Sequence, residues 1–166
     1  MIPTLTTERL TLRAPHLADF EAFADHCASP RATFEDGPLD RDAAWGEFAA
    51  AAGSWLLHGF GAWSIEDSVT GDYLGEVLIQ QPPAFAEPEL GWTLMAQAEG
   101  KGIASEAARA ARNWAFATLN LPTLVSYISK DNTRSIALAE RLGATRDATA
   151  PAPAKDDLVY RHEVPA

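Results

Sequence analysis

The sequence predicts a mixed α/β fold in which helices pack on a single sheet. Residues 89–94 alternate apolar with small or polar side chains, which is typical of a strand. After Gly100 and Gly102 the apolar residues recur at helical spacing as far as Leu119. A second apolar strand is predicted at 123–129. Because these two strands flank a helix, we expect them to lie parallel and to be joined by a right-handed crossover.

The residues before this segment predict two helices and three antiparallel strands. Apolar positions at helical spacing, among them Leu17, Cys27, Trp45 and Phe48, are expected to face the core. The predicted elements are, in chain order, a strand at Leu10–Arg13, a helix at Pro15–Cys27, a helix from Asp40 to Gly59, and strands at Ala62–Glu66 and Tyr73–Ile79.

The residues after the parallel pair predict one more helix and two short strands. Asn132 is expected to cap the helix, and strands are expected at 144–147 and 158–164. Three prolines keep residues 80–88 out of any central ladder. The prediction is therefore a single domain over residues 1–166, with about seven mostly antiparallel strands, a central parallel pair and about four helices.

The acidic character of the chain is uneven along its length. The net charge is −10, and residues 1–96 hold 4 basic and 15 acidic side chains. Residues 97–146, in contrast, hold 7 basic and 4 acidic side chains and form a basic island. A negative surface argues against nucleic acid as a partner. The basic island favours an anionic cofactor nearby, with chance clustering on solvated helix faces as the alternative.

Cysteine and histidine usage excludes several classes of protein. Cys27 is the only cysteine, which rules out an internal disulfide and agrees with a reducing cytoplasm. The four histidines are scattered without the spacing of metal ligands, so no metal site is predicted. No stretch is apolar for the length that a membrane span requires, and no signal peptide is recognised, so we expect a cytoplasmic protein.

The turn between strand 89–94 and the following helix has the features of an anion site. Gly100 and Gly102 allow positive φ angles and close approach of a phosphate, and Lys101 adds a positive charge. The first turn of the helix supplies backbone N–H groups without intrahelical partners. A P-loop does not fit, because Met95 stands where its first glycine should be, and a dinucleotide fingerprint fits weakly. An ordinary tight turn is the alternative interpretation.

Three motifs, in order along nearly the whole chain, resemble those of one known family. They are Thr7-Glu8-Arg9-Leu10-x-Leu12-Arg13, then Gln97-x-x-Gly100-x-Gly102, and then Asp131-Asn132-x-x-Ser135-Ile136-x-x-x-x-x-Leu142-Gly143. The second and third resemble the cofactor loop and the asparagine block of the GNAT N-acetyltransferase superfamily. The first resembles the opening strand of its RimJ/RimL-type branch.

The resemblance implies acetyl-CoA as the cosubstrate and a splayed pair of central strands that admits it. The backbone of Leu94 and Met95 would pair with the pantetheine arm, and an N–H near Met95 would face the thioester oxygen. Asn132 would bind the same arm, although its side chain suits a helix cap equally well. The residues implied to hold the pyrophosphate through their amides include Gln97, Gly100, Lys101, Gly102, Ile103 and Ala104.

The resemblance also implies which side chains would move protons. Many GNAT enzymes use a tyrosine seven residues after the family asparagine, but that position is Ala139 here. Ser135 is the substitute donor to the leaving thiolate, or else a passive cofactor contact. Glu89 is the candidate general base, acting through a water, with Glu87 and Glu76 in reserve. A solvated surface glutamate is the alternative for each.

The predicted function is transfer of an acetyl group from acetyl-CoA to a primary amine by direct attack in a ternary complex. The amine would belong to a protein N-terminus or a small molecule, and the acidic residues 1–96 favour a cationic acceptor. A catalytically idle CoA-binding or regulatory module is the alternative, motivated by Ala139, and a nucleotide-dependent oxidoreductase is a weaker one. Neither nucleic acid nor a membrane is expected as a partner, and a homodimer is left open.

Overall fold

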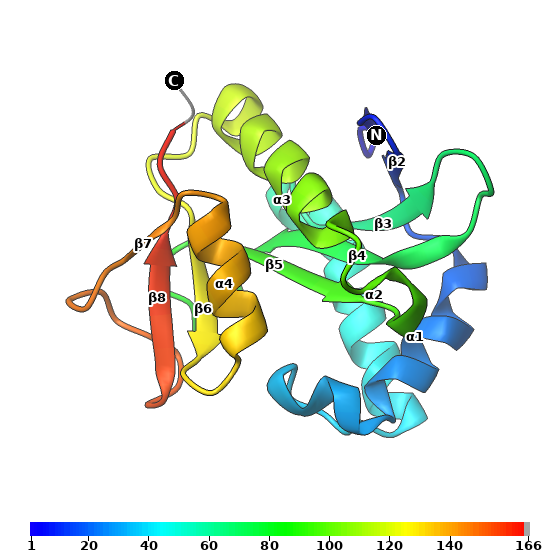
Figure 1. Ribbon diagram of the computed structural model, residues 1–166, viewed down its shortest axis with the longest axis horizontal. Coiled ribbons are helices and arrows are strands. Elements are labelled where there is room, and N and C mark those ends of the chain that lie inside the picture. The colour runs from blue at the N-terminus through cyan, green and yellow to red at the C-terminus, as the bar shows by residue number, and fades with distance from the viewer. Residues whose placement is uncertain (165–166) are drawn as a thin grey trace.

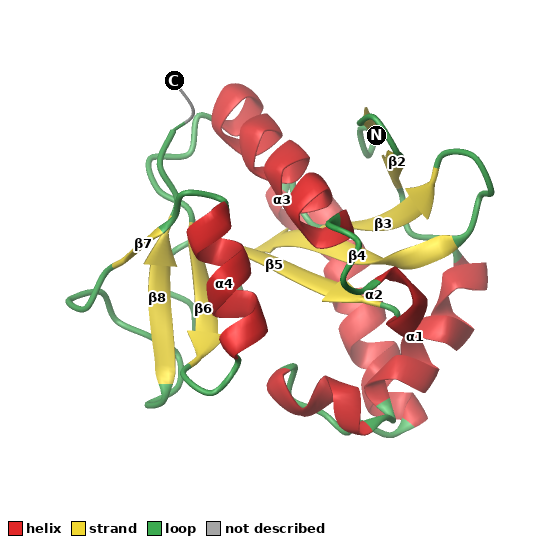
Figure 2. Cartoon of the chain, viewed as in Figure 1, coloured by secondary structure: helices red, strands yellow, loops and turns green. Residues whose placement is uncertain are grey.

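The computed structural model describes residues 1–164 and shows one mixed sheet with helices on both faces (Figures 1 and 2). The strands are β1 (Leu5–Thr6), β2 (Leu10–Arg13), β3 (Ala62–Asp67), β4 (Tyr73–Gln80), β5 (Glu89–Leu94), β6 (Val125–Ser129), β7 (Thr145–Arg146) and β8 (Asp157–Arg161). The helices are α1 (Phe20–Cys27), α2 (Arg41–His58), α3 (Ile103–Trp114) and α4 (Thr133–Arg141). Residues 165–166 of the predicted domain lie outside the described residues.

The eight strands follow the order β1-β2-β3-β4-β5-β6-β8-β7 across the sheet. Every neighbouring pair is antiparallel except β5 and β6. The predicted mixed α/β fold with one central parallel pair is therefore confirmed. The sheet has one strand more than predicted, because the two residues of β1 pair with β2. Within residues 1–164, none of the helices combines the length and the apolarity that crossing a bilayer demands.

Helices α1 and α2 pack against each other on one face of the sheet through a small aromatic cluster. Phe48 and Cys27, both predicted to face the core, are buried in it. The same prediction for Trp45 is wrong, because this side chain is 47% exposed. Trp45 lies at the rim of the cluster, edge-on to Phe20 with 5.0 Å between ring centroids, so only one side of its indole is covered.

The first helix is shorter than predicted at its N-terminal end. Residues 17–19 form a 3₁₀ turn, and α1 begins at Phe20 rather than at Pro15. The carboxylate of Asp19 accepts hydrogen bonds from the His16 amide and the Ser64 hydroxyl, which fixes this turn to the sheet. Leu17 precedes the helix and does not share its buried face, so it is 72% exposed rather than inward as predicted.

Helix α3 lies on the opposite face of the sheet (Figure 1). Its buried side is rich in alanine, including the fully buried Ala107, which lets the helix approach the sheet closely. The ring of Trp114 packs edge-on against Trp63 of β3, with 5.1 Å between centroids. The turn predicted to extend the helix to Leu119 is π-helical, and Asn120 follows it with a left-handed φ of 50°.

Strands β5 and β6 pair at one register position and then part. They are in register at Glu89 and Val125, where the Val125 N–H donates to the Pro88 carbonyl at 3.0 Å. Figure 1 shows the two strands diverging from this point. Because successive backbone groups of a strand point to alternate sides, Trp92 and Leu94 direct their N–H groups toward β6. The described chain places no ladder partner opposite these two amides.

A side chain satisfies the last carbonyl at the point where the strands part. Ser126 Oγ on β6 donates to the Leu90 carbonyl on β5 at 2.6 Å and lies 2.9 Å from Nε2 of the buried His162. Because Ser126 gives its only hydrogen to Leu90, His162 must donate from Nε2 and leave Nδ1 unprotonated. Burial lowers the pKa of His162 to about 4, so the ring is neutral in this position.

Replacing Ser126 tests whether its hydrogen bonds with the Leu90 carbonyl and His162 stabilise the sheet. Ser126→Ala should lower the free energy of unfolding by about 1–3 kcal/mol, because the Leu90 carbonyl and the His162 N–H are left buried without partners. Urea unfolding measures the change. Ser129→Ala removes only a 3.4 Å contact with the Asp131 amide and should cost less than about 0.5 kcal/mol. Equal stability of the two variants would contradict this role of Ser126.

Candidate active site

Two cavities meet at the opening between β5 and β6. The larger, of about 740 Å³, borders the first turn of α3 and the start of α4, and the smaller, of about 490 Å³, covers the opposite face of β4 and β5. We call them the basic cavity, which is lined by three arginines, and the acidic cavity, which is lined by carboxylates. The residues that line both cavities, and so mark their junction, are Phe34, Glu35, Trp92, Asn132 and Ser135.

The first turn of α3 forms one wall of the basic cavity, as the sequence predicts for an anion site. Gly100 and Gly102 adopt positive φ angles of 71° and 77°, and both line the cavity together with Ile103 and Ala104. Gly102 is the N-cap of α3 and brings no side chain, so the N–H groups of the first turn have no side-chain cap. Such a turn binds phosphate groups readily.

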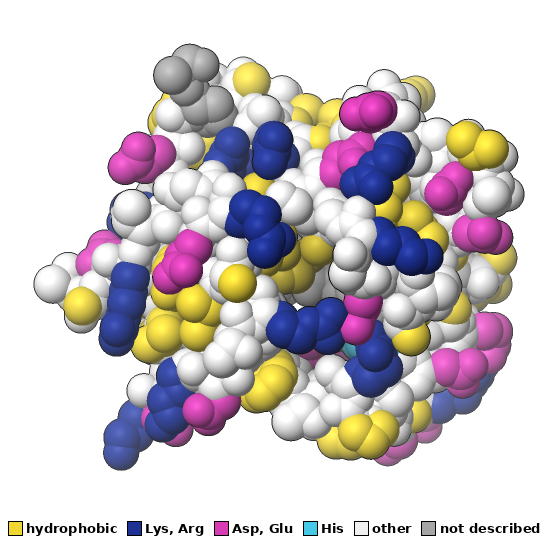
Figure 3. Space-filling view, viewed as in Figure 1, with side chains coloured by type: hydrophobic (Ala, Val, Ile, Leu, Met, Phe, Trp, Pro, Cys, Tyr) yellow, Lys and Arg dark blue, Asp and Glu magenta, His cyan; other side chains and the backbone are white. Residues whose placement is uncertain are grey.

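Positive side chains complete this wall of the basic cavity. Arg31, Arg134 and Arg141 line it, and Figure 3 shows Lys and Arg side chains gathered around the hollow at the centre of this face. The carboxylate of Glu99 forms ion pairs with Arg31 and, at 2.8 Å, with Arg134. Glu99 thereby connects the segment before α2 with α4 across the cavity. Three carboxylates also line this cavity, so its formal charges balance, in contrast to the acidic cavity; they are Glu35, Glu99 and Asp131.

Two of the residues whose amides are predicted to hold the pyrophosphate, Gln97 and Lys101, are not among the residues that line the basic cavity. The side chain of Gln97 donates to the Tyr73 carbonyl at 3.4 Å, which turns it toward β4. Lys101 is exposed, and its carbonyl accepts a hydrogen bond from Arg9 at 3.0 Å. The glycines of the predicted loop therefore face the cavity, whereas its two long polar side chains do not.

The backbone of Met95 is also outside the cavity. Its N–H donates to the Leu74 carbonyl at 2.9 Å, so it is committed to the β4 side of β5. The N–H of Met95 itself is therefore not free to face the thioester oxygen, and the predicted donor near Met95 has to be a neighbouring amide. Alternation along the strand instead leaves the amides of Trp92 and Leu94 on the open edge, and both residues line the basic cavity.

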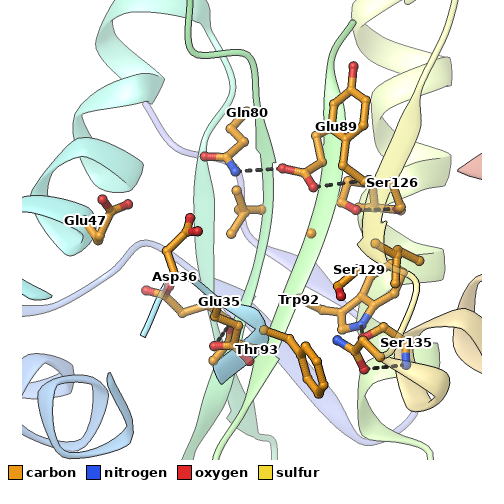
Figure 4. Close-up of a pocket in the computed structure, with 18 of the residues that line it drawn as sticks. Glu35, Asp36, Glu47, Gln80, Glu89, Trp92, Thr93, Ser126, Ser129 and Ser135 are labelled. Atoms are coloured by element: carbon orange, nitrogen blue, oxygen red, sulfur yellow. Dashed lines mark hydrogen bonds between the residues drawn. The ribbon is translucent and has the colours of Figure 1, made fainter. Parts of the chain in front are cut away.

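Asn132 and Ser135 occupy the junction of the two cavities, as Figure 4 shows for Ser135 beside Trp92. The Asn132 side chain accepts a hydrogen bond from the Ser135 amide at 3.2 Å, so the capping role is present. Ser135 Oγ accepts a hydrogen bond from the Trp92 indole at 3.3 Å. Because this contact uses only a lone pair, the hydroxyl hydrogen of Ser135 is free to be donated to a ligand.

Glu89 lies in the wall of the acidic cavity and is only 8% exposed. Gln80 donates to one carboxylate oxygen at 2.7 Å and the Tyr127 amide to the other at 3.3 Å, as Figure 4 shows. Burial raises the pKa of Glu89 to about 7, although both hydrogen bonds oppose the shift. The surface-glutamate alternative is therefore wrong for Glu89. A carboxyl with this pKa exchanges protons near neutral pH.

The two reserve glutamates differ sharply from each other. Glu87 does not line either cavity and pairs with Arg161 at 2.6 Å, and this hydrogen bond lowers the pKa of Glu87. Glu76 lines the acidic cavity and is 3% exposed. Within residues 1–164 its Oε1 has no hydrogen-bond partner. Burial, followed by repulsion from Asp19 and Glu35, raises the pKa of Glu76 to about 8.

Glu35 is a site residue that sequence reasoning missed. It lines both cavities, and its Oε2 is held by the Thr93 hydroxyl at 3.0 Å and by His26 Nε2 at 2.9 Å. Figure 4 shows Glu35 and Thr93 close together below Gln80 and Glu89. Glu35 follows a short 3₁₀ segment and belongs to no periodic element, so no pattern in the sequence distinguished it from its acidic neighbours.

The fold and the site together define a class of enzyme that transfers acyl groups from coenzyme A. An open strand edge beside an uncapped helix N-terminus suits a ligand with a diphosphate and an amide-bearing arm. The chain matches the family model described as Acetyltransferase (GNAT) domain over residues 9–145. The protein belongs to the GNAT family of N-acetyltransferases.

Comparison with known proteins agrees with this assignment. An acetyltransferase structure from Agrobacterium tumefaciens str. C58 is 51% identical, with a TM-score of 0.95 over 98% of this chain and 95% of that chain. RimL, a ribosomal L7/L12 α-N-protein acetyltransferase in complex with coenzyme A, shares the fold at 16% identity, with a TM-score of 0.77 over 98% of each chain. The uncharacterized protein YkkB of Bacillus subtilis (strain 168) is 32% identical over 88 residues, which is 52% of this chain and only about half, 51%, of YkkB.

The burial of Glu76 predicts a pH-dependent gain in stability when its charge is removed. Its pKa rises from 4.5 to about 8 on folding, so the carboxyl costs nothing below pH 4.5, where it is protonated in both states. As pH rises to 8 the unfolded chain ionises first, and stability is lost. Glu76→Gln should therefore be more stable than the parent by at least about 1 kcal/mol at pH 8 and nearly equal at pH 4.5.

Thermal unfolding at the two pH values measures this difference. Glu8→Gln, a substitution of the same kind at an exposed position, should leave stability unchanged at both. A Glu76→Gln variant that is less stable than the parent at pH 8 would show that the carboxylate has a stabilising partner.

Proposed function

We propose that this protein transfers the acetyl group of acetyl-CoA to a primary amine, either a protein N-terminus or a small molecule, in a ternary complex. The observation that carries the proposal is the meeting of two different cavities at the open edge of β5: one has arginines beside an uncapped helix N-terminus, and the other is lined by carboxylates without a basic side chain. One cavity suits a polyanionic cosubstrate and the other an amine. Their junction brings both ligands to the same point.

The basic cavity would receive acetyl-CoA. The uncapped N–H groups at the start of α3 would bind the diphosphate beside Gly100 and Gly102, and the arginines would neutralise the phosphate charge. The free amides of Trp92 and Leu94 would pair with the pantetheine arm, as an added strand pairs with a sheet edge. The thioester would then lie at the junction, beside Ser135.

The acidic cavity would then supply the nucleophile and accept its proton. The neutral amine nitrogen attacks the thioester carbonyl, the new C–N bond forms, and the C–S bond breaks. The N–H of Trp92 would stabilise the negative charge that develops on the carbonyl oxygen. Glu89 would take the proton released by the amine, through a water. Ser135 would donate to the leaving thiolate, which is a good leaving group without a strong acid.

The proposal is tested by incubating the protein with acetyl-CoA and a panel of primary amines and detecting acetylated products by mass spectrometry. Calorimetry measures acetyl-CoA binding in parallel. Binding together with amide formation supports the transferase. Binding without turnover of any amine, peptides included, would instead favour the idle CoA-binding module, which the absence of a tyrosine at Ala139 motivates. Failure to bind acetyl-CoA at millimolar concentration would exclude both.

Glu89→Gln should separate proton transfer from binding. The variant keeps the volume and one hydrogen-bonding oxygen, so it should fold and bind acetyl-CoA within about twofold of the parent. Its kcat should fall by at least about 10²-fold, because the general base is lost. The parent's kcat should rise with pH through about 7, as Glu89 ionises, and the variant should lack this limb. Glu87→Gln, outside both cavities, is the matched control, and an equal loss there would overturn the assignment.

Ser135→Ala should have a much smaller effect than loss of the base. Because a coenzyme A thiolate leaves without a strong acid, we expect kcat to fall by less than about tenfold, below the usual range of general-acid contributions. Steady-state kinetics with a saturating amine measures the change. A loss as large as that of Glu89→Gln would mean that protonation of the thiolate limits the reaction.

A further inference from the structure

The acidic cavity is lined by an unusual number of carboxylates. They come from the segment before α2, from α2 itself, from β4 and β5 and from the start of β8, and are Glu35, Asp36, Glu47, Glu76, Glu89 and Asp157. Among the described residues that line this cavity there is no lysine, arginine or histidine. The space between the carboxylates is walled by apolar side chains, including Phe34, Leu78 and Phe85. Carboxylates separated by apolar surface suit a ligand that alternates cationic and aliphatic parts.

Glu76 provides a second observation that points to a cationic ligand. Its side chain is 3% exposed, forms part of the cavity wall, and has one oxygen with no hydrogen-bond partner within residues 1–164. A buried carboxylate without a cation is unfavourable, and a mutually repelling neighbour, Glu35, makes it more so. An ammonium group placed between Glu76 and Glu35 would satisfy the free oxygen and remove the repulsion.

The register of β4 and β5 sets the distance between the carboxylates of Glu76 and Glu35 and the point where the amine would meet the thioester. Glu76 is opposite Thr93, the residue that holds Glu35, whereas Gln80 is opposite Glu89 at the other end of the cavity. Gly91 lies midway on the same face, next to Trp92 and the opening toward the thioester. Gly91 and Thr93 are two positions apart along the strand, which corresponds to a distance of about 7 Å between them.

We propose, on the basis of the transferase function above, that the acceptor is a linear aliphatic diamine or polyamine. Its reacting amine lies near Gly91, between Glu89 and the thioester. Its second nitrogen, as an ammonium, binds Glu76 and Glu35. A spacer of roughly three to five methylene groups matches the distance of about 7 Å between the two positions. The remaining carboxylates receive any further ammonium group of a longer polyamine.

Two other occupants fit the cavity less well. A divalent cation needs several oxygens that converge on one point, and residues 1–164 contain no group of three His, Cys, Asp or Glu side chains arranged to hold a metal ion. A peptide N-terminus carries a single ammonium group, which could pair with only part of a wall that holds six carboxylates. The carboxylates are distributed along the cavity, as an extended polycation requires.

A chain-length series tests the proposal. The specificity constant kcat/KM is measured for α,ω-diamines with two to eight methylene groups, for monoamines of equal length, and for a lysine-containing peptide with a free N-terminus. We expect a maximum at three to five methylene groups, with the best diamine exceeding the equal-length monoamine by about tenfold or more, the effect of one charge-assisted contact. Calorimetry of the diamines without acetyl-CoA gives a readout that does not depend on turnover.

Variants identify the carboxylate responsible. Glu76→Gln should reduce the diamine-to-monoamine ratio of kcat/KM by about tenfold and weaken diamine binding in calorimetry to a similar extent. Glu8→Gln removes the same charge at an exposed position outside the cavity and should change neither. Because Glu76→Gln removes a buried charge, the variant is expected to remain folded.

Each contrary result has a distinct meaning. Monoamines that react as well as diamines, or a peptide that reacts faster than every diamine, would overturn the polyamine proposal and leave the acetyltransferase intact. If no amine is acetylated, the proposed function fails, and the calorimetric series still decides whether the cavity binds diamines. A ratio unchanged by Glu76→Gln would overturn the assignment of the second ammonium.

Discussion

The early end of pairing between β5 and β6 is the constraint on which the site depends. After the register position at Glu89 and Val125, β5 forms no further backbone hydrogen bonds with β6 among the described residues. Backbone groups that are buried without hydrogen-bond partners are costly. Ser126 limits that cost by satisfying the Leu90 carbonyl, so the open edge that remains consists of the backbone groups of Trp92 and Leu94, including their two N–H donors. The same parting of the strands joins the cavities on the two faces of the sheet. Substrate access and backbone donors therefore have a single structural origin.

The two cavities on opposite faces of the sheet differ in the charged side chains that line them. The basic cavity draws its charge from arginines of the segment before α2 and of α4, and the acidic cavity from carboxylates on the sheet and its covering helices. Glu99 holds Arg31 and Arg134 in place, so part of the basic charge is organised before any anion arrives. A polyanion would be repelled by the carboxylates of the acidic cavity and attracted by the arginines and the N-terminus of α3 on the other face. Two substrates are thus distinguished by charge before they meet at Trp92 and Ser135.

Periodicity in the sequence predicted the elements that position the site, but not which edge of a strand is free. The alternation of β5 and the glycines before α3 identify the anion site from local pattern alone, and both elements lie where they are predicted. Assigning the free amide requires knowing that β4 takes the N–H of Met95, and this is a property of the neighbouring strand rather than of local sequence. Glu35 depends likewise on a loop folding over Thr93.

Glu76 illustrates how a local inconsistency in a fold marks function. Its strand is otherwise suited to burial, with Val77 and Ile79 fully covered, yet Glu76 places an unpartnered carboxylate oxygen against the acidic cavity. A glutamine of the same volume would avoid the cost of burying charge, and selection for stability alone would favour it. Nearby on β4, the hydroxyl of Tyr73 is also buried without a hydrogen-bond partner among residues 1–164, so this strand holds two polar groups that the described part of the chain does not satisfy. Such groups persist in folded proteins where a ligand completes them, and an ammonium group would favour and satisfy the ionised carboxylate of Glu76.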